Sequence, residues 1–198
     1  MKTKLVLSLI FAVASANAAT ISFSNFDSGT FAGLAIVDSS NNLLGTASTA
    51  EVGFFSDEAL ASVGDFTTWN SFGSVASFGA GYDLAGVYSG DASSSTAGAS
   101  SFIGQSITTL ITSASGSEYL VAKSDQTFGQ DNPLFTATVN IFSDSGITYL
   151  FGGTAGSSVD FGTGPQSSIQ TAAVPEPSAY ALLGGLFALT CVMLRRRA

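Results

Sequence analysis

The side chains in this sequence that could do chemistry are mostly carboxylates. The chain of 198 residues has no histidine, and its single cysteine, Cys191, lies near the C-terminus. This composition excludes a Ser-His-Asp triad, a histidine-ligated metal and a thiol nucleophile in the body of the chain. Two carboxylates can still hydrolyse a glycosidic bond. The candidate pairs are Asp57 with Glu58 and Asp125 with Asp131, but no local motif marks either pair, so we expect no catalytic residues and no cofactor.

Calcium binding is a second chemistry that carboxylates allow. Hard oxygen ligands in a loop suit Ca²⁺, and the segment 125–132 brings Asp125 and Asp131 close together in the sequence. The segment lacks the Asp-x-Asp-x-Asp spacing and the terminal glutamate of an EF-hand. We therefore favour turn-forming Asp and Asn residues before Pro133, with Asp125 and Asp131 as the calcium candidates.

Three further side chains have both a functional and a structural interpretation. Trp69 and Tyr82 could offer an aromatic platform to a carbohydrate, although large aromatic residues such as Trp69 are more often buried. Lys123 is the only basic residue between positions 19 and 172, and would have to serve any Ser-Lys catalytic pair. The alternation along its strand places Lys123 outward, which favours a solvated charge that discourages pairing at a sheet edge.

The elements that must position these residues are predicted to be strands. Short runs of β-branched and aromatic residues alternate with Gly, Asn, Asp and Ser clusters, which predicts an all-β fold, sandwich-like or of another Gly/Ser-rich type. In the first run, Ile21 and Phe23 alternate with serines, as in a half-buried strand. The turn sequence Asp144-Ser145-Gly146 predicts a hairpin between the last two strands. The expected strands are 20–26, 34–37, 118–123, 135–142 and 147–151.

One short helix is expected at 57–63. Ser56 would cap it, Asp57 and Glu58 would lie near its positive end, and Gly64 would end it. Residues 90–101 and 152–158 have few large apolar side chains and are predicted to be flexible loops. Residues 162–165 and 166–173 are predicted to form a last strand and a linker. We therefore expect one acidic, β-rich exported domain at 19–172.

The C-terminal segment has three parts: Pro175-Glu176-Pro177, an apolar run at 179–194, and Arg195, Arg196 and Arg197. The prolines fix φ and lack amide donors, so the chain there is extended. A helix over the sixteen apolar residues would span about 24 Å, less than the ~30 Å core of a bilayer. The arginines would then stop a single transmembrane helix with its end in the cytoplasm. A permanent single-pass anchor and a buried core helix remain open.

The order and spacing of these three parts resemble a PEP-CTERM sorting domain, over residues 174–197. That family occurs in Gram-negative bacteria that make exopolysaccharide. The resemblance implies that segment 173–198 is recognised by an exosortase, a membrane-embedded enzyme resembling cysteine transpeptidases, and processed near Pro175, Glu176 and Pro177. These three would be substrate residues, and the membrane helix would be a temporary anchor.

The N-terminus is predicted to be a signal peptide, residues 1–18. Lys2 and Lys4 form a basic start, an apolar stretch follows, and Ala16-Asn17-Ala18 has the small-x-small pattern of a cleavage site. Signal peptidase would cut between Ala18 and Ala19. Export followed by a C-terminal stop gives an inner-membrane intermediate whose body lies outside the cytoplasm.

The negative charge of the body limits the partners that it can bind. Residues 19–172 carry thirteen carboxylates and one lysine, and such a surface repels nucleic acid. Fourteen phenylalanines there favour a folded core over disorder. We expect an exported structural protein of the cell surface or extracellular matrix, with extracellular polysaccharide as a candidate partner. The alternatives are a carbohydrate- or calcium-binding surface module and, after that, a glycoside hydrolase.

Overall fold

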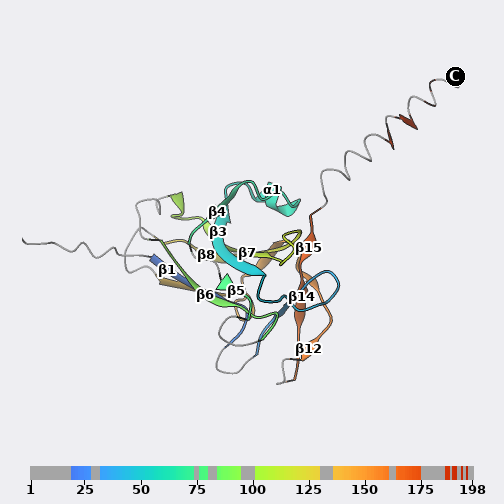
Figure 1. The fold of residues 1–198 in the computed structure, drawn as a ribbon. Coiled ribbons are helices and arrows are strands. Elements are labelled where there is room, and N and C mark those ends of the chain that lie inside the picture. The colour runs from blue at the N-terminus through green and yellow to red at the C-terminus, as the bar shows by residue number, and fades with distance from the viewer. Residues whose placement is uncertain are drawn as a thin grey trace, which may run out of the picture.

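The computed structural model describes residues 19–27, 32–73, 76–79, 84–94, 101–129, 136–160 and 164–174, with Leu186, Phe187, Leu189, Thr190, Met193 and Arg195 in the C-terminal segment. The described body is built mainly of strands, which confirms the all-β prediction (Figure 1). Its elements are β1 (Ala19–Ser24), β2 (Ala35–Val37), β3 (Thr49–Phe55), α1 (Glu58–Ser62), β4 (Trp69–Ser71), β5 (Ala76–Ser77), β6 (Ser89–Ser94), β7 (Ser106–Thr112), β8 (Glu118–Thr127), β9 (Thr136–Asn140), β10 (Thr148–Phe151), β11 (Thr154–Ala155), β12 (Val159–Asp160), β13 (Pro165–Gln166), β14 (Ser168–Gln170) and β15 (Ala172–Ala173).

A seven-stranded sheet forms the centre of the body. Its strands follow the order β10-β8-β7-β3-β4, with β15 added to β8 and β5 added to β3. Strand β7 has the sequence Ser-Ile-Thr-Thr-Leu-Ile-Thr, and its five middle residues are all buried. A strand buried on both faces is typical of the middle of a sheet that is covered on both sides.

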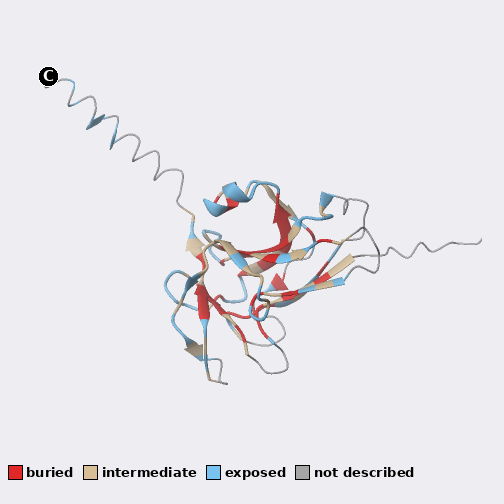
Figure 2. Cartoon of the chain, turned by 180° about the vertical axis from the view of Figure 1, so that it is seen from behind, coloured by how far each residue is buried: buried red, intermediate tan, exposed pale blue. Residues whose placement is uncertain are grey.

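One face of this sheet shares a core with a smaller sheet of order β6-β1-β9. In β1, Ile21 and Phe23 are fully buried while the intervening serine is only half-buried, which confirms the predicted alternation. β1 runs antiparallel to β6 and parallel to β9, with Phe23 opposite Val139. Figure 2 shows the buried residues, in red, along several strands of the body.

The other face of the large sheet is covered by α1 and a second apolar cluster. Phe55, Ala61, Leu110 and Val121 are its buried members, with half-buried aromatic side chains packed around them. Lys123 lies on this side and its Nζ is 2.7 Å from Glu58 Oε1 at the start of α1. The predicted position at a sheet edge is therefore wrong, because β8 has neighbours on both sides. The Lys123 side chain remains partly exposed, at 28%, and links the helix to the sheet.

The helix forms where it was expected, but with a different cap. Asp57, rather than Ser56, precedes the first helical residue, and its carboxylate accepts hydrogen bonds from the backbone amides of Ala59 and Leu60. A carboxylate satisfies these free donors better than a hydroxyl because it also meets the positive end of the helix. Gly64 ends the helix as predicted, in the left-handed region at φ 83°.

The predicted hairpin at Asp144-Ser145-Gly146 is wrong in its pairing. A turn does lie there, but β9 pairs with β1 in the small sheet while β10 pairs with β8 in the large one. The Asp144 carboxylate accepts the backbone amide of Asn140 and the side chain of Gln126. The turn sequence therefore carries the chain between sheets instead of joining two neighbouring strands.

Three predicted irregular stretches also contain strands, and one of them is 152–158, in which β11 pairs with β14. Residues 89–94 form β6, because its Ser- and Gly-rich chain pairs along the whole of β1. Residues 166–173 are no linker: β14 pairs with β2, and β15 pairs with β8. The backbone amide of Val174 still bonds to the carbonyl of Ser117, at 3.1 Å. The folded body therefore reaches position 174.

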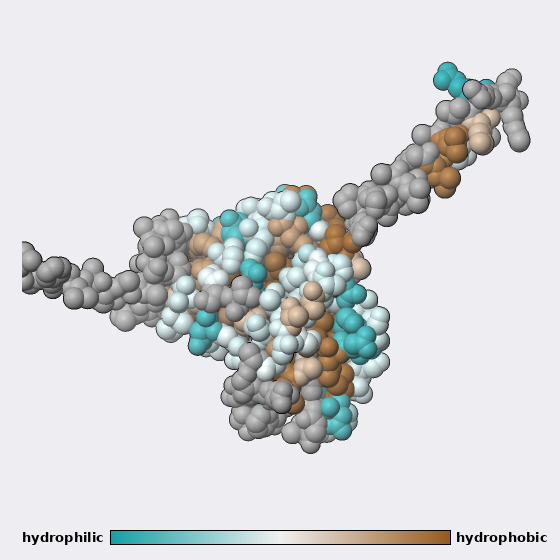
Figure 3. Space-filling view, in the orientation of Figure 1, coloured by the Kyte–Doolittle hydropathy of each residue, from teal (hydrophilic) through white to brown (hydrophobic). Residues whose placement is uncertain are grey.

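The two ends of the chain are described only in part. The predicted signal peptide, including Ala18, and the residues Pro175, Glu176, Pro177, Arg196 and Arg197 lie outside the described residues. Of the apolar tail, Leu186, Phe187, Leu189, Thr190 and Met193 are helical and exposed, and Figure 3 shows this stretch as hydrophobic. Among the residues described, no helix is long and apolar enough to cross a membrane.

Candidate functional site

Both carboxylates of the first candidate pair, Asp57 and Glu58, have partners within the fold. Asp57 caps α1, and Glu58 binds Lys123 through both of its carboxylate oxygens, at 2.7 and 2.8 Å. Glycoside hydrolysis needs two carboxyl groups that face each other across a substrate. Adjacent residues at the start of a helix, each held by a different partner, do not provide that arrangement.

The second pair is not assembled in the described part of the chain. Asp125 lies within β8, is exposed, and its carboxyl group lies against Gly146. Asp131 lies outside the described residues. Over the residues that the structure describes, no three His, Cys, Asp or Glu side chains come together to hold a metal ion.

Trp69 belongs to the second apolar cluster instead of forming a flat exposed platform. It is half-buried, its ring centroid is 4.9 Å from that of Phe55, and its indole N–H donates to Glu51 at 3.2 Å. These contacts agree with a packing role. Tyr82, the other aromatic candidate, lies outside the described residues.

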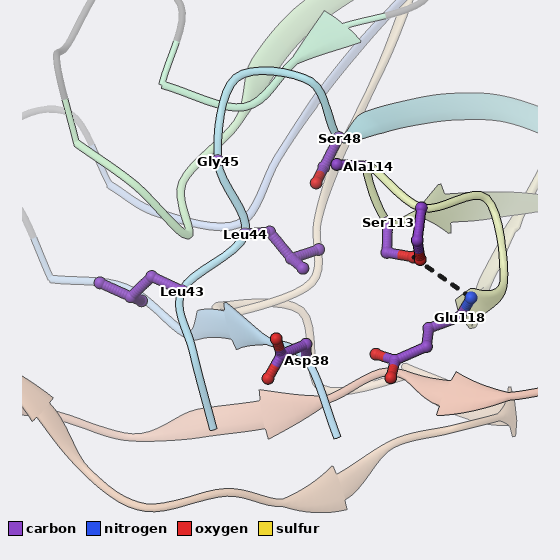
Figure 4. Close-up of a pocket in the computed structure, with 9 residues that line it drawn as sticks. Asp38, Leu43, Leu44, Gly45, Ser48, Ser113, Ala114 and Glu118 are labelled. Atoms are coloured by element: carbon purple, nitrogen blue, oxygen red, sulfur yellow. Dashed lines mark hydrogen bonds between the residues drawn. The ribbon is translucent and has the colours of Figure 1, made fainter. Parts of the chain in front are cut away.

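A pocket of about 250 Å³ lies where three segments meet: the end of β2, the loop that leads to β3, and the β7–β8 hairpin turn. Sequence reasoning did not find it. Figure 4 shows Asp38 and Glu118 on one side of Leu44 and Ser48 on the other. The residues that line it are Asp38, Leu43, Leu44, Gly45, Ser48, Ser113, Ala114, Ser115 and Glu118.

Glu118 is held firmly at the start of β8. Its carboxylate accepts hydrogen bonds from the hydroxyl of Ser39 at 2.5 Å, from the backbone amide of Ser39 at 3.1 Å and from the hydroxyl of Thr171 at 2.7 Å. Burial by itself would raise the pKa of this carboxyl, but these donors outweigh it and lower the pKa below its usual value. Glu118 is therefore ionised at neutral pH.

Asp38 is fixed by the turn that follows β2. Its carboxylate accepts the backbone amides of Ser40 and Asn42, both at 2.8 Å, and the side-chain amide of Asn42. Slight burial opposes ionisation, yet these donors lower the pKa of Asp38 below its ordinary value. The negative charge of Asp38 in turn raises the pKa of Glu118 slightly, which indicates that the two carboxylates are electrostatic neighbours.

Hydroxyl groups form the rest of the polar lining. The Ser113 hydroxyl accepts the backbone amide of Glu118 at 3.2 Å and exchanges a hydrogen bond with Ser115 at 3.0 Å. Ser48 differs from these two: it is 1% exposed and its hydroxyl has no hydrogen-bond partner. The pocket thus combines two carboxylates, three hydroxyls and the apolar side chains of Leu43 and Leu44.

This arrangement offers fixed negative charge and acceptor oxygens on one side of the pocket. No sequence signal links Asp38 with Glu118, because one follows β2 and the other begins β8, and these strands belong to different sheets that only the fold brings together.

Comparison with known proteins adds no relative. No family model, curated protein or solved structure matches this chain. The resemblance of the tail to a sorting domain therefore rests on its motif alone and stays a prediction.

Proposed function

We propose that this protein is an exported structural protein of the cell surface or extracellular matrix, sorted and processed through its C-terminal segment by an exosortase-type enzyme. The observation that supports the proposal is where the described strands lie relative to the two expected cuts. β1 begins at Ala19, the first residue expected after signal peptidase cleavage, and β15 ends at Ala173, before Pro175.

Both expected cuts would spare the folded body. A cut between Ala18 and Ala19 leaves every residue of β1 in place. At the other end, β15 pairs with β8 and Val174 bonds to Ser117, so a cut near Pro175, Glu176 and Pro177 removes no described strand. A sorting signal that is removed must not take strands of the domain with it, and these two cuts would leave every described strand in the mature chain.

A structural role also fits the body itself. The body contains no cysteine, so its stability depends on the core between the sheets, which is consistent with a sandwich-like arrangement. Of the candidate catalytic carboxylates that the structure describes, Asp57 caps α1 and Glu58 binds Lys123, while Asp125 lies on β8. An acidic surface would keep such a protein soluble outside the cell and would leave extracellular polysaccharide as a candidate partner.

Intact-mass analysis of the chain from its host, with and without the exosortase, tests the proposal. In the competent cell the mature protein should begin at Ala19 and end within 175–178. In the deletion strain it should keep Arg195, Arg196 and Arg197. Replacing Pro175, Glu176 and Pro177 together by alanine should give the same unprocessed end, while the matched variant Ser178→Ala should be processed normally.

Two results would contradict the proposal. One is a wild-type chain that retains its terminal arginines in the competent cell. The other is a triple-alanine variant that is cut as efficiently as the wild type. A mature chain that begins at Met1 would overturn the export step separately, because the N-terminal and C-terminal masses are read from the same spectrum.

A further inference from the structure

The most exposed large apolar side chain that the structure describes in the body lies beside the point where the chain leaves it. Val63, the residue that ends α1, is 66% exposed. A Cβ built on the next residue, Gly64, would lie 3.1 Å from the ring of Phe151 and 3.3 Å from a methyl group of Val174. Val174 is the last described residue of the body, and Figure 1 shows α1 and β15 together at this exit.

Aromatic side chains extend the apolar surface away from the exit. The ring centroid of Phe66 is 5.5 Å from that of Phe151 and 4.5 Å from that of Tyr119, and all three side chains are half-buried. Tyr119 lies opposite Ala172 in the large sheet, two residues before Val174. Figure 3 shows hydrophobic side chains on the body at the base of the tail. The exit patch consists of Val63, Phe66, Tyr119, Phe151 and Val174.

The position of the exit is fixed by the sheet. β15 pairs with β8, and directly after it the backbone amide of Val174 donates to the carbonyl of Ser117 at 3.1 Å. Four residues, 175–178, then separate Val174 from the apolar run at 179–194. An extended chain advances at most about 3.5 Å per residue, so this linker reaches no farther than about 14 Å.

A tail that enters a bilayer therefore brings the exit patch to the lipid headgroups. The headgroup region adds roughly 5–8 Å to each side of the ~30 Å hydrocarbon core. The apolar run would span only about 24 Å as a helix, so part of the linker would be drawn into the membrane with it. Only a few ångströms of linker remain between Val174 and the headgroups. The length of the linker thus identifies a lipid surface as the partner of this patch.

The composition of the patch selects the kind of lipid. Aliphatic side chains and a tyrosine with a polar end are favoured where hydrocarbon meets water. The body around the patch is acidic: it carries thirteen carboxylates and one lysine, and Asp65 lies between Val63 and Phe66 in the sequence. Anionic headgroups would repel this surface, so neutral lipids suit it better.

We propose that the exit patch is a lipid-contact surface, which rests on neutral headgroups while the C-terminal segment is held in the membrane. This rests on the proposed function, because an exosortase-type enzyme lies in the membrane and the C-terminal segment must reach it there. It adds which face of the body meets the lipid, and so how the body is oriented when the segment 175–178 is presented for processing.

Fluorescence quenching of the full chain in phosphatidylcholine vesicles tests the proposal. In a Cys191→Ser background, an environment-sensitive label is attached to Val63→Cys. Ile103→Cys is the matched control, because Ile103 is an apolar residue, 40% exposed, beyond the opposite end of β7 and β8. Lipids with a quencher at headgroup depth should quench the label at 63 several-fold more strongly than the label at 103. Replacing half of the lipid by phosphatidylserine should reduce this difference.

Flotation of the same vesicles separates this proposal from the proposed function. A chain that floats, but whose label at 63 is quenched no more than the label at 103, overturns the lipid-contact surface and leaves the sorting proposal standing. A chain that does not float has no tail in the membrane, which overturns both. A chain that floats with strong quenching at 63 supports the contact surface, whatever intact-mass analysis shows about processing. Both labelled variants should unfold at the wild-type temperature, since both positions are exposed.

Discussion

Asn25 and Tyr88 are joined by two hydrogen bonds at the centre of the body. The side-chain oxygen of Asn25 accepts the backbone amide of Tyr88 at 2.8 Å, and the backbone amide of Asn25 donates to the carbonyl of Tyr88 at 3.4 Å. The Asn25 side-chain amide also donates to the carbonyls of Leu34 and Gly86, both at 2.8 Å. One fully buried side chain thereby fixes the end of β1 to two separate loops.

Replacing Asn25 should be among the most destabilising polar changes in the protein. Asn25→Ala leaves an amide and two carbonyls without their partners, and should lower the free energy of unfolding by about 3 kcal/mol. Asn25→Asp keeps the shape but loses both donors and introduces a buried charge, so it should cost at least as much at neutral pH. Urea unfolding measures both. Asn70→Ala, which removes one partly buried bond, should cost under about 1 kcal/mol, and equal losses for Asn25 and Asn70 would contradict this account.

Alanine substitutions at Gly53 and at Gly45 should change the free energy of unfolding in opposite directions. A Cβ added at Gly53, in β3, would lie 2.1 Å from the carbonyl oxygen of Asn70 and 2.8 Å from the ring of Trp69. Gly53→Ala must therefore push β4 away, and should cost about 2–3 kcal/mol. A Cβ at Gly45 meets nothing within 4 Å. Gly45→Ala should raise the free energy of unfolding by roughly 0.5 kcal/mol, because it restricts the unfolded chain.

Urea denaturation of the two glycine variants side by side is the measurement. If Gly53→Ala proved as stable as the wild type, the close approach of β3 and β4 would be wrong. A loss at Gly45 as large as that at Gly53 would show that crowding against β4 does not explain the loss at Gly53.

The strands that sequence reasoning found are those with a strong local pattern. Ile21 and Phe23 alternate with serines, and a strand with one buried face needs nothing more to be recognised. The helix was found for the same reason, since acidic residues and Gly64 mark its ends within a few positions. Its cap was misplaced by one residue because Ser56 and Asp57 are both favourable caps, and only the backbone geometry separates them.

The features that were missed depend on partners far away in the sequence. β6 is rich in Ser and Gly and becomes a strand because β1 lies beside it. The turn at 144–146 is a true turn, yet the pairing of β9 and β10 is decided by two different sheets. The pocket was invisible for the same reason: Asp38 and Glu118 each look like an ordinary polar residue at the end of a strand.

The ion pair between Lys123 and Glu58 should contribute little to stability. The two side chains are 28% and 45% exposed, so water screens their attraction. A double-mutant cycle with Glu58→Gln and Lys123→Gln should give a coupling energy of about 0.5 kcal/mol, decreasing toward zero in 1 M NaCl. A coupling that keeps its size in salt would mean that the pair is effectively buried and that α1 depends on it.

Tyr88 should control the stability of the protein at alkaline pH. It is 1% exposed, and its hydroxyl lies beside that of Thr109 without either forming a hydrogen bond of good geometry. Burial raises the pKa of the Tyr88 phenol far above the ordinary value of 10.0. The folded state therefore keeps the phenol neutral, while the unfolded chain ionises near pH 10. The stability that this provides is complete below that pH and is lost as the pH rises further.

The variant Tyr88→Phe tests the direction of this pH dependence of stability. Removing a buried hydroxyl without a partner should leave the free energy of unfolding at pH 7 unchanged or raise it by up to about 1 kcal/mol. Above pH 10 the variant should lose stability less steeply than the wild type, because one ionisation of the unfolded chain is gone. Urea midpoints from pH 7 to 11 measure both effects. Tyr119→Phe is the control: its hydroxyl donates to the carbonyl of Gly116 at 2.7 Å, so that variant should be slightly less stable at pH 7. A Tyr88→Phe variant that is destabilised at pH 7 would show that the hydroxyl is hydrogen-bonded in the core. A variant that runs parallel to the wild type above pH 10 would show that the fold does not raise the pKa of Tyr88.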